Sequence, residues 1–348
     1  MVKVGVNGAA GRIGKFTTLE LLQIPEIEVV ALNDPVGAKA LVDNYNLQDS
    51  THGELGLHAE YIPNDRIMLN GKPVKIYKEK DASKIPWHET GVKIVEECSG
   101  FYTKDGAAKI HLNNGAERVI VSAPATGEEL VTIIMGVNQE DFNPKIHNYI
   151  SNASCTTKAL ATPLKLLMDK GIKIEALLMD TVHASTNSQH VLDFGDEAAT
   201  LDNIVLTSTG AAKATSLVMP SLKSMDGFAA RVPTNDGSFA NLYFVANFNG
   251  RLDTEIINQM IKGSYLENRY FGRIGIFEGE NVSSKRNIIG RKENAIVITS
   301  RTRVLPLSPS IDGGDHYLIN LVSGYDNERG PPKDQALLTR YIADKCKC

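Results

Sequence analysis

Residues 2–14 read VKVGVNGAAGRIG and decide the fold of the first half of the chain. A run of β-favouring residues comes first, a turn with three glycines follows, and a helical pattern comes next. This order of strand, glycine-rich turn and helix is typical of a dinucleotide-binding unit. We expect Gly8 to make the tight turn, Gly11 to let the backbone approach a pyrophosphate, and Gly14 to let helix and strand pack closely.

A second strand-like run, residues 28–32, ends in Asn33-Asp34-Pro35. Asp34 comes about twenty residues after the glycines, where an acidic side chain can accept hydrogen bonds from ribose hydroxyls and repel a 2′-phosphate. The sequence therefore favours NAD over NADP. The glycine spacing is Gly-x-x-Gly-x-x-Gly rather than Gly-x-Gly-x-x-Gly, which leaves NADP open as an alternative.

The remaining strand-like runs predict two domains. Early runs alternate with helical or loop segments, which favours a doubly wound parallel sheet of Rossmann type in residues 1–150. Late runs are longer and alternate apolar with polar residues, which favours an α+β catalytic domain with an antiparallel sheet in residues 151–330. A final amphipathic helix is expected over 335–346. The early runs are 75–77, 94–98, 119–122 and 146–150, and the late runs are 241–247, 295–300 and 317–322.

Residues 151–158 read SNASCTTK and place Cys155 between the run at 146–150 and a helical pattern at 159–170. A cysteine near a helix N-terminus is favoured as thiolate, and the thiolate is the nucleophile. The free backbone N–H groups there can hold an oxyanion or phosphate. Ser154 and Thr156 can cap the helix or bind an anion. The alternative is a small buried cysteine in a turn.

His183 follows the apolar run 176–179 and would activate Cys155 if the two side chains met. A lone histidine at a strand end is usually structural, and spacing cannot establish the contact. Residues 208–213 form a hydroxyl–glycine–helix-start pattern suited to an anion, and the guanidinium of Arg231 suits a phosphate. The polar segment 49–53 is predicted to be a surface turn.

Composition limits the function classes. A chain of 348 residues favours two domains, and a net charge of −4 without a basic arm argues against nucleic acid or an anionic membrane as partner. We expect no leader peptide, because residue 2 already begins a strand, and no membrane span. Four scattered cysteines fit a reducing cytoplasm, with no metal site, and Cys346 and Cys348 are expected in a solvated tail.

Taken together, these motifs give the chain a specific likeness. From residue 2 to about residue 342 it resembles the phosphorylating glyceraldehyde-3-phosphate dehydrogenase family. The motifs that carry the resemblance are VGVNG with GRIG, NDP at 33–35, DSTHG at 49–53, SNASCTT at 151–157, TVHA at 181–184, STGAAKA at 208–214, RVPT at 231–234 and YDNE at 325–328.

The resemblance implies a reaction and its residues. Cys155 would attack the aldehyde of glyceraldehyde 3-phosphate to give a thiohemiacetal, with His183 handling the protons while hydride passes to NAD. Inorganic phosphate would then cleave the thioester to 1,3-bisphosphoglycerate, a step of glycolysis and gluconeogenesis. Matching residues for the attacking phosphate are Ser154, Thr156, Thr209 and Gly210, those for the substrate phosphate are Thr186 and Arg231, and those for the cofactor are Arg12, Ile13, Asp34, Ser99, Ser122 and Asn327.

The resemblance also implies a homotetramer whose last helix, 331–348, completes the cofactor domain. Several departures from the family pattern leave alternatives open. Lys158 stands where the family usually has Asn, and it would lower the thiol pKa if it pointed inward or do nothing if it pointed to solvent. A shortened loop at 189–208 and altered residues 329–332 leave open erythrose 4-phosphate as substrate. Lys158, together with Gly324 where the family usually has Trp, leaves open a catalytically slow NAD-binding regulatory protein.

Overall fold

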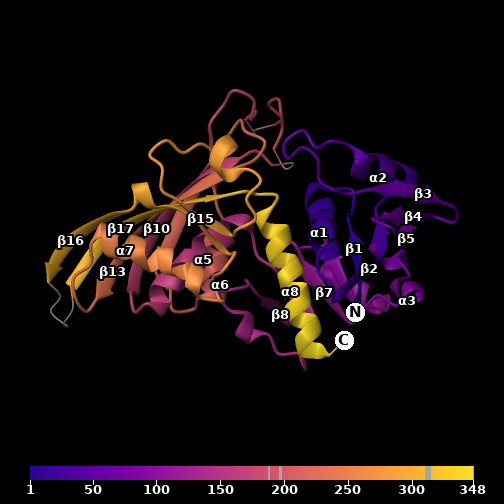
Figure 1. Ribbon diagram of the computed structural model, residues 1–348, viewed down its shortest axis with the longest axis horizontal. Coiled ribbons are helices and arrows are strands. Elements are labelled where there is room, and N and C mark those ends of the chain that lie inside the picture. Colours follow the sequence, from indigo (N-terminus) through magenta and orange to yellow (C-terminus); the bar gives the residue numbers. More distant parts are fainter. Residues whose placement is uncertain (187–188, 196–197, 310–314, 348) are drawn as a thin grey trace. The chain divides into compact units, whose positions relative to one another are not determined.

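The computed structural model describes residues 1–186, 189–195, 198–309 and 315–347. The chain forms two compact units. Unit 1 consists of Met1–Ala153 together with Pro331–Cys348, and unit 2 consists of Ser154–Gly330 (Figure 1). Among the described residues, no helix is both long and apolar enough to cross a membrane.

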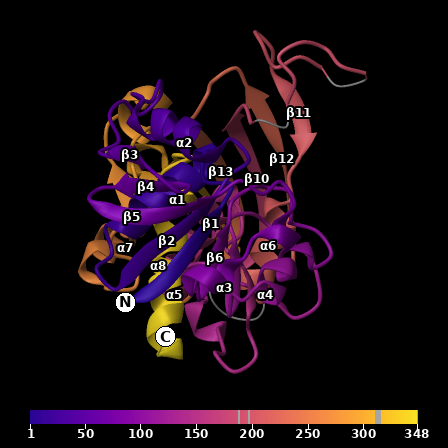
Figure 2. The same cartoon turned by 90° about the vertical axis from the view of Figure 1, so that its right-hand side faces the viewer.

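Unit 1 is built on a nine-stranded sheet in the order β3-β4-β5-β2-β1-β6-β7-β9-β8. The strands are β1 (Val2–Asn7), β2 (Ile27–Asn33), β3 (Ala59–Ile62), β4 (Arg66–Leu69), β5 (Lys72–Tyr77), β6 (Ile94–Glu97), β7 (Arg118–Val121), β8 (Leu130–Thr132) and β9 (Tyr149–Ser151). Neighbouring strands from β5 to β8 run parallel. Strands β3, β4 and β5 form an antiparallel edge (Figure 2). The predicted Rossmann-type sheet is confirmed.

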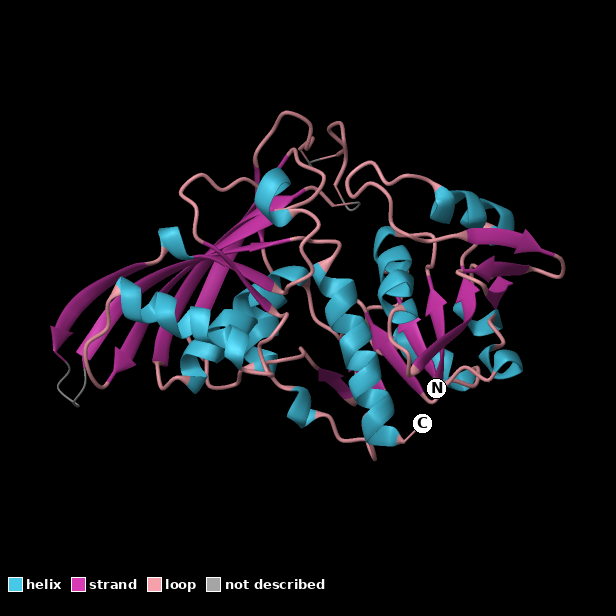
Figure 3. Ribbon diagram, in the orientation of Figure 1, coloured by secondary structure: helices cyan, strands magenta, loops and turns pink. Residues whose placement is uncertain are grey.

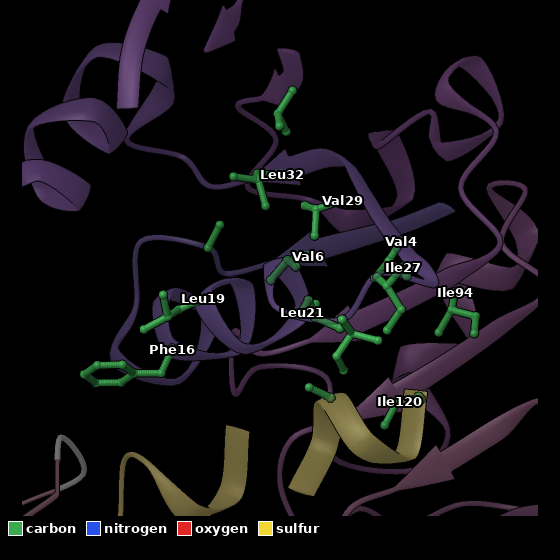
Figure 4. Packing of buried hydrophobic residues seen from close by; sticks show 14 of the residues in the cluster. Val4, Val6, Phe16, Leu19, Leu21, Ile27, Val29, Leu32, Ile94 and Ile120 are labelled. Carbon is green, nitrogen blue, oxygen red and sulfur yellow. The ribbon is translucent and has the colours of Figure 1, made fainter. Parts of the chain in front are cut away.

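Helices connect the strands of unit 1 and cover its core. They are α1 (Arg12–Leu22), α2 (Gly37–Asn46), α3 (Trp87–Thr90), α4 (Ile110–Asn113) and α8 (Gly330–Cys346), with short turns η1 (Ala82–Lys84), η2 (Ala107–Lys109) and η3 (Gln139–Asp141). The core joins apolar side chains of β1, β2 and α1, including Val4, Val6, Phe16, Leu21 and Val29 (Figure 4). The first four residues of β2 alternate buried with half-buried positions because successive side chains point to opposite faces, whereas β6 and β9 are buried throughout.

Helix α8 returns to this core from the far end of the sequence. Its side chains Ala336, Leu338 and Ile342 are fully buried in the same cluster as β1 and β2. It begins at Gly330, earlier than the predicted residue 335, because two prolines are tolerated in a first turn. Cys346 also packs against the cluster, so the prediction of a solvated tail is wrong there, and Cys348 lies outside the described residues.

Unit 2 is built on an eight-stranded sheet in the order β11-β12-β10-β13-β17-β15-β14, with β16 paired to β17. The strands are β10 (Lys173–Ala184), β11 (Val205–Ser208), β12 (Met225–Val232), β13 (Ser238–Phe248), β14 (Ile274–Phe277), β15 (Ala295–Ile298), β16 (Arg303–Pro309) and β17 (Asp315–Tyr325). Five pairs are antiparallel, while β10 with β12 and β14 with β15 run parallel. The predicted antiparallel sheet is confirmed as a mixed sheet rich in antiparallel pairs.

Helices cover one face of this sheet (Figure 3). They are α5 (Cys155–Asp169), α6 (Ala211–Val218) and α7 (Thr254–Lys262), with short turns η4 (Gly263–Leu266), η5 (Ser284–Ile288) and η6 (Thr299–Arg301). Helix α5 packs on β10, β13, β15 and β17, and α6 packs on β12. Alternate residues of β10 and β13 are therefore buried against helices, and the residues between them point to the opposite face.

Candidate functional site

Cys155 is the first residue of helix α5 rather than part of the loop before it. The helix begins here and not at the predicted residue 159, because Ser154 caps it: the Ser154 Oγ accepts a hydrogen bond from the backbone N–H of Thr157 at 3.0 Å. Ala153 has a φ of 56°, which turns the chain sharply from β9 into the helix. The thiol consequently sits in the first turn, where backbone N–H groups lack helical partners.

His183 meets Cys155, and sequence spacing could not establish this contact. Its Nε2 lies 3.6 Å from the Cys155 Sγ. His183 is part of β10, which extends to Ala184 instead of ending at residue 179. The strand holds the ring because His183 Nδ1 lies 2.7 Å from the carbonyl oxygen of Ala184. The Ala184 oxygen can only accept, so this contact favours the Nδ1–H tautomer, in which Nε2 presents its lone pair to the thiol.

Arg231 lies beside the same imidazole. Strands β10 and β12 are parallel neighbours, and their register places Arg231 directly opposite His183. The Arg231 Nη1 contacts His183 Nδ1 and donates to the carbonyl oxygen of Ala184 at 3.3 Å. Burial, and then the charge of Arg231, lower the pKa of His183 to about 4, against the Ala184 hydrogen bond and the charge of Asp236. His183 is therefore a neutral base near pH 7.

The thiol itself responds to opposing influences. Burial raises the pKa of Cys155 above its ordinary value, while hydrogen bonding to Thr156 and the charges of Lys158 and Arg231 lower it. Burial is the largest of these influences, and it acts against the thiolate that the helix N-terminus favours. The resting pair is a thiol facing a neutral imidazole, and the thiolate forms when the proton moves to Nε2.

A chain of three hydroxyl groups supports the first turn of α5. Thr181 Oγ1 donates to the carbonyl oxygen of Phe239 at 3.0 Å, so it accepts from the Tyr325 hydroxyl at 2.8 Å. Tyr325 in turn accepts from Thr156 Oγ1 at 2.9 Å. All three hydroxyls are buried. Sequence reasoning assigned no role to Tyr325 or Thr181, because only the pairing of distant strands brings them under Thr156.

Asn327 follows β17 and lies beside His183. Its Nδ2 is 3.3 Å from both ring nitrogens, and its Oδ1 accepts from the Ser238 Oγ at 2.8 Å. Its backbone N–H donates to Asp236 Oδ1 at 2.9 Å. Unit 2 therefore brings Cys155, His183, Arg231 and Asn327 together.

The other residues expected to bind anions lie at helix or strand ends of unit 2. Gly210 precedes α6, and Thr209 Oγ1 accepts from the backbone N–H of Ala211 at 3.2 Å. Thr186 follows β10 and donates from its backbone N–H to Gln189 Oε1 at 2.8 Å. Ser154 and Thr156 stand at the start of α5. The N-terminus of α5 has the N–H groups that an oxyanion requires.

In unit 1 the glycine turn is packed too tightly for side chains. A Cβ on Gly14 would lie 2.1 Å from the carbonyl oxygen of Gly8, and one on Gly8 would lie 2.7 Å from the backbone of Ser99. Gly8 also has a φ of 79°. Gly11 precedes α1, and since it has no side chain the first turn keeps its N–H groups for a ligand phosphate. This cradle fits a dinucleotide.

Asp34 and Arg12 have defined partners near this turn. Asp34 Oδ2 accepts from the backbone N–H of Ala10 at 3.0 Å, which ties the end of β2 to the turn. Arg12, which opens α1 before Ile13, forms an ion pair with Asp49, and Lys15 contacts the same carboxylate at 3.4 Å. Asp49 is 6% exposed, so the prediction of an ordinary surface turn is wrong for this residue.

Ser99 and Ser122 follow the adjacent strands β6 and β7, at the edge where such sheets bind ligands. Glu97, which sequence reasoning missed, fixes Ser99 by accepting from its backbone N–H at 2.7 Å and its Oγ at 2.5 Å. The other Glu97 oxygen pairs with buried His111 at 2.8 Å. An acidic residue at a buried strand position was the available signal.

Comparisons with known proteins agree with this arrangement. Residues 2–105 match the family model described as glyceraldehyde 3-phosphate dehydrogenase, NAD binding domain, and residues 154–327 match that of the C-terminal domain. The chain is 40% identical over 351 residues to glyceraldehyde-3-phosphate dehydrogenase 1 of Bacillus subtilis (strain 168), covering 99% of both chains. It is 38% identical to the glyceraldehyde-3-phosphate dehydrogenases of Priestia megaterium (99% of both chains) and Clostridium pasteurianum (100% of both).

Proposed function

The chain belongs to the glyceraldehyde-3-phosphate dehydrogenase family, and from this premise we propose that it oxidises glyceraldehyde 3-phosphate to 1,3-bisphosphoglycerate with NAD and inorganic phosphate. The observation that carries the proposal is the 3.6 Å approach of Cys155 Sγ to a neutral His183 Nε2, beside Arg231. A nucleophile facing a base is the arrangement that covalent aldehyde oxidation requires.

The first step forms the covalent bond to substrate. The thiol proton moves to His183 Nε2, the Cys155 sulfur attacks the aldehyde carbon, and the imidazolium returns the proton to the carbonyl oxygen. This gives a thiohemiacetal. Backbone N–H groups of the first turn of α5 stabilise the negative oxygen as it develops. Arg231 is the residue proposed to bind the phosphate of the substrate; its guanidinium suits a phosphate, and its position opposite His183 supports the assignment.

The second step oxidises the intermediate and the third releases it. His183 Nε2 takes the hydroxyl proton of the thiohemiacetal, and the carbon becomes a thioester as hydride leaves. NAD supplies the hydride acceptor when bound. Inorganic phosphate then attacks the thioester carbon, forming the acyl phosphate and expelling the Cys155 thiolate. Ser154, Thr156, Thr209 and Gly210 are the residues proposed to hold that phosphate.

A kinetic experiment tests this function. We expect the protein to form NADH from glyceraldehyde 3-phosphate only when phosphate or arsenate is present, with a lower kcat/KM for erythrose 4-phosphate. Cys155→Ser should abolish turnover, and His183→Asn should lower kcat by about 10²–10⁴-fold. Cys98→Ser, which alters a half-buried cysteine of unit 1, is the control and should keep wild-type activity.

Three outcomes would contradict the proposal in whole or in part. NAD binding without a burst of acyl-enzyme would favour the regulatory alternative. A higher kcat/KM for erythrose 4-phosphate would reassign the substrate and keep the chemistry. Turnover without phosphate or arsenate would show that the product is not an acyl phosphate.

We also propose that the subunits form a homotetramer in the cytoplasm, using the face of the unit 2 sheet opposite its helices. This face carries seven exposed apolar side chains: Leu178, Val182, Leu206, Phe228, Tyr243, Leu305 and Leu307. Their strand register supports a shared face, since Leu178 lies opposite Tyr243. A patch of this kind on a β-sheet usually marks an interface.

A further inference from the structure

Lys158 is a buried lysine in the active-site helix. It lies in α5, one turn after Cys155, and its exposed fraction is 1%, which makes it one of the largest fully buried side chains of the protein. The sequence left two alternatives, a side chain that points inward and one that points to solvent. The structure rules out the solvent alternative.

The helix geometry directs this side chain toward the thiol. The backbone around Lys158 is regular: its N–H donates to the carbonyl oxygen of Ser154 at 3.1 Å. Side chains in a helix lean toward its N-terminus and cover the residues three and four positions earlier. For Lys158 those residues are Cys155 and Ser154. The ammonium therefore belongs to the environment of the sulfur, together with Arg231, His183 and Tyr325 from β12, β10 and β17.

These groups do not share the same charge state. His183 is neutral near pH 7, so it brings no positive charge to the resting thiol. Tyr325 is buried and keeps its proton, since burial raises its pKa well above the ordinary value. Lys158 and Arg231 are the two cations of this set that act on Cys155. Arg231 belongs to β12 and contacts the imidazole and the Ala184 carbonyl. Lys158, in contrast, belongs to the same helix as the nucleophile.

We propose that Lys158 is a positioning residue that stabilises the Cys155 thiolate from within helix α5. It acts twice in the proposed reaction, on which this role rests. When the thiol proton moves to His183 Nε2, Lys158 offsets the negative charge left on sulfur. When phosphate expels the sulfur from the thioester, Lys158 stabilises the same thiolate as leaving group. Lys158 transfers no proton in either step.

The test measures the thiol without any substrate. Alkylation of Cys155 by iodoacetamide is followed from pH 5 to 10 in the free full-length protein, with peptide mass spectrometry separating Cys155 from the other cysteines. Lys158→Met keeps the length of the side chain and removes its charge, and Lys158→Asn places the residue that the family usually has. Lys165→Met is the matched control, because Lys165 lies on the same helix and pairs with Asp169.

We expect the midpoint of the alkylation profile to rise by about one pH unit or more in both Lys158 variants and to stay unchanged in Lys165→Met. One unit leaves about tenfold less thiolate at pH 7, but less acidic thiolates are better nucleophiles, so the rate falls only about threefold. The midpoint is therefore the deciding quantity. Circular dichroism confirms folding, and Lys158→Gln replaces Lys158→Met if the latter does not fold.

Unchanged midpoints in both variants would overturn the proposal. A rise in Lys158→Asn alone would also overturn it, since the smaller side chain would then act through lost packing rather than lost charge. The measurement is independent of the aldehyde. If glyceraldehyde 3-phosphate is not oxidised while the midpoint responds to Lys158, the proposed function fails and the role of Lys158 in stabilising the thiolate stands.

Discussion

The decisive residue of the site is an imidazole that stays neutral. Burial and the neighbouring Arg231 lower the pKa of His183 to about 4, below the ordinary value of 6.5. The unfolded chain then binds more protons than the folded chain between pH 6.5 and 4. The free energy of unfolding therefore falls as the pH drops through that window, while the base stays available above it.

Removing the charge of Arg231 should raise the pKa of His183 toward its ordinary value. We expect the imidazole in Arg231→Gln to titrate at higher pH than in the wild type, as measured by NMR of histidine Cε1–H resonances and assigned with His183→Asn. Arg251→Gln, which alters an exposed arginine, is the control and should leave the titration unchanged. A wild-type His183 titrating near pH 6.5 would contradict the assigned role of burial.

Asp34 provides a second prediction for a single residue. Its carboxylate holds the backbone N–H of Ala10, and its negative charge would repel a 2′-phosphate. We expect Asp34→Asn to lower the ratio of kcat/KM for NAD to that for NADP by at least about tenfold, or about 1.4 kcal/mol. A general disturbance of the turn would lower kcat/KM for both coenzymes, so it cancels in their ratio. Asp43→Asn in α2 is the control, and a ratio that stays constant in Asp34→Asn would remove Asp34 from coenzyme selection.

Local residues were easier to predict than their partners. The glycine turn was predictable because strand, turn and helix are consecutive. The contact between His183 and Arg231 was not, because it depends on the register of two strands whose residues are 48 positions apart. Asp49 was missed for a similar reason, since an exposed turn and a buried ion pair with Arg12 have the same local sequence signal.

The bounds of helices and strands were also hard to predict where they depend on partners distant in the sequence. The start of α5 was misplaced because Thr156 and Thr157 are β-branched and read as non-helical, whereas the Ser154 cap admits them into the first turn. Strand β10 was too short in the prediction, since its polar residues Asp180 and Thr181 find partners only in β13 and β17. Helix α8 was predicted as amphipathic, and its packing partner was implied by the family resemblance alone.

The attachment of α8 to β6 depends on an unusual carboxyl group. Glu96 is fully buried, and it accepts hydrogen bonds from Gln335 and Thr339 of α8. Burial raises the pKa of Glu96 to about 7, although the two hydrogen bonds oppose this. The folded chain thus binds the extra proton between pH 4.5 and 7, so this contribution to stability is present at low pH and is lost as the pH rises through 7.

Replacing this carboxyl group should stabilise unit 1 in alkaline solution. Glu96→Gln resembles the protonated acid, and we expect it to increase the free energy of unfolding by roughly 3 kcal/mol at pH 8, with little difference from the wild type at pH 4.5. Calorimetry at both pH values measures the difference in Tm between Glu96→Gln and the wild type. Glu60→Gln on the exposed side of β3 is the control. A gap that is equal at both pH values would assign the effect to packing instead.

At the scale of the whole molecule, the sheet of unit 2 offers two unlike faces. Helices cover one, and the other presents the seven apolar side chains proposed as the subunit interface. We expect Leu178→Lys to dissociate the proposed tetramer, because it places a charge opposite Tyr243 in the patch. Analytical ultracentrifugation measures the assembly. Leu266→Lys, at a position 91% exposed on η4, is the control. An intact tetramer in Leu178→Lys would show that the interface does not use this face.

The order of the chain through the two units has a consequence for biosynthesis. Unit 2 is one continuous stretch, whereas the core of unit 1 needs Ala336, Leu338 and Ile342 from the far end. On the ribosome, domains commonly fold in the order of their synthesis. Here the order differs: all strands of unit 2 are synthesised before the α8 side chains that complete the core of unit 1. During translation the apolar side chains of β1, β2 and α1 therefore lack these packing partners until α8 has been synthesised.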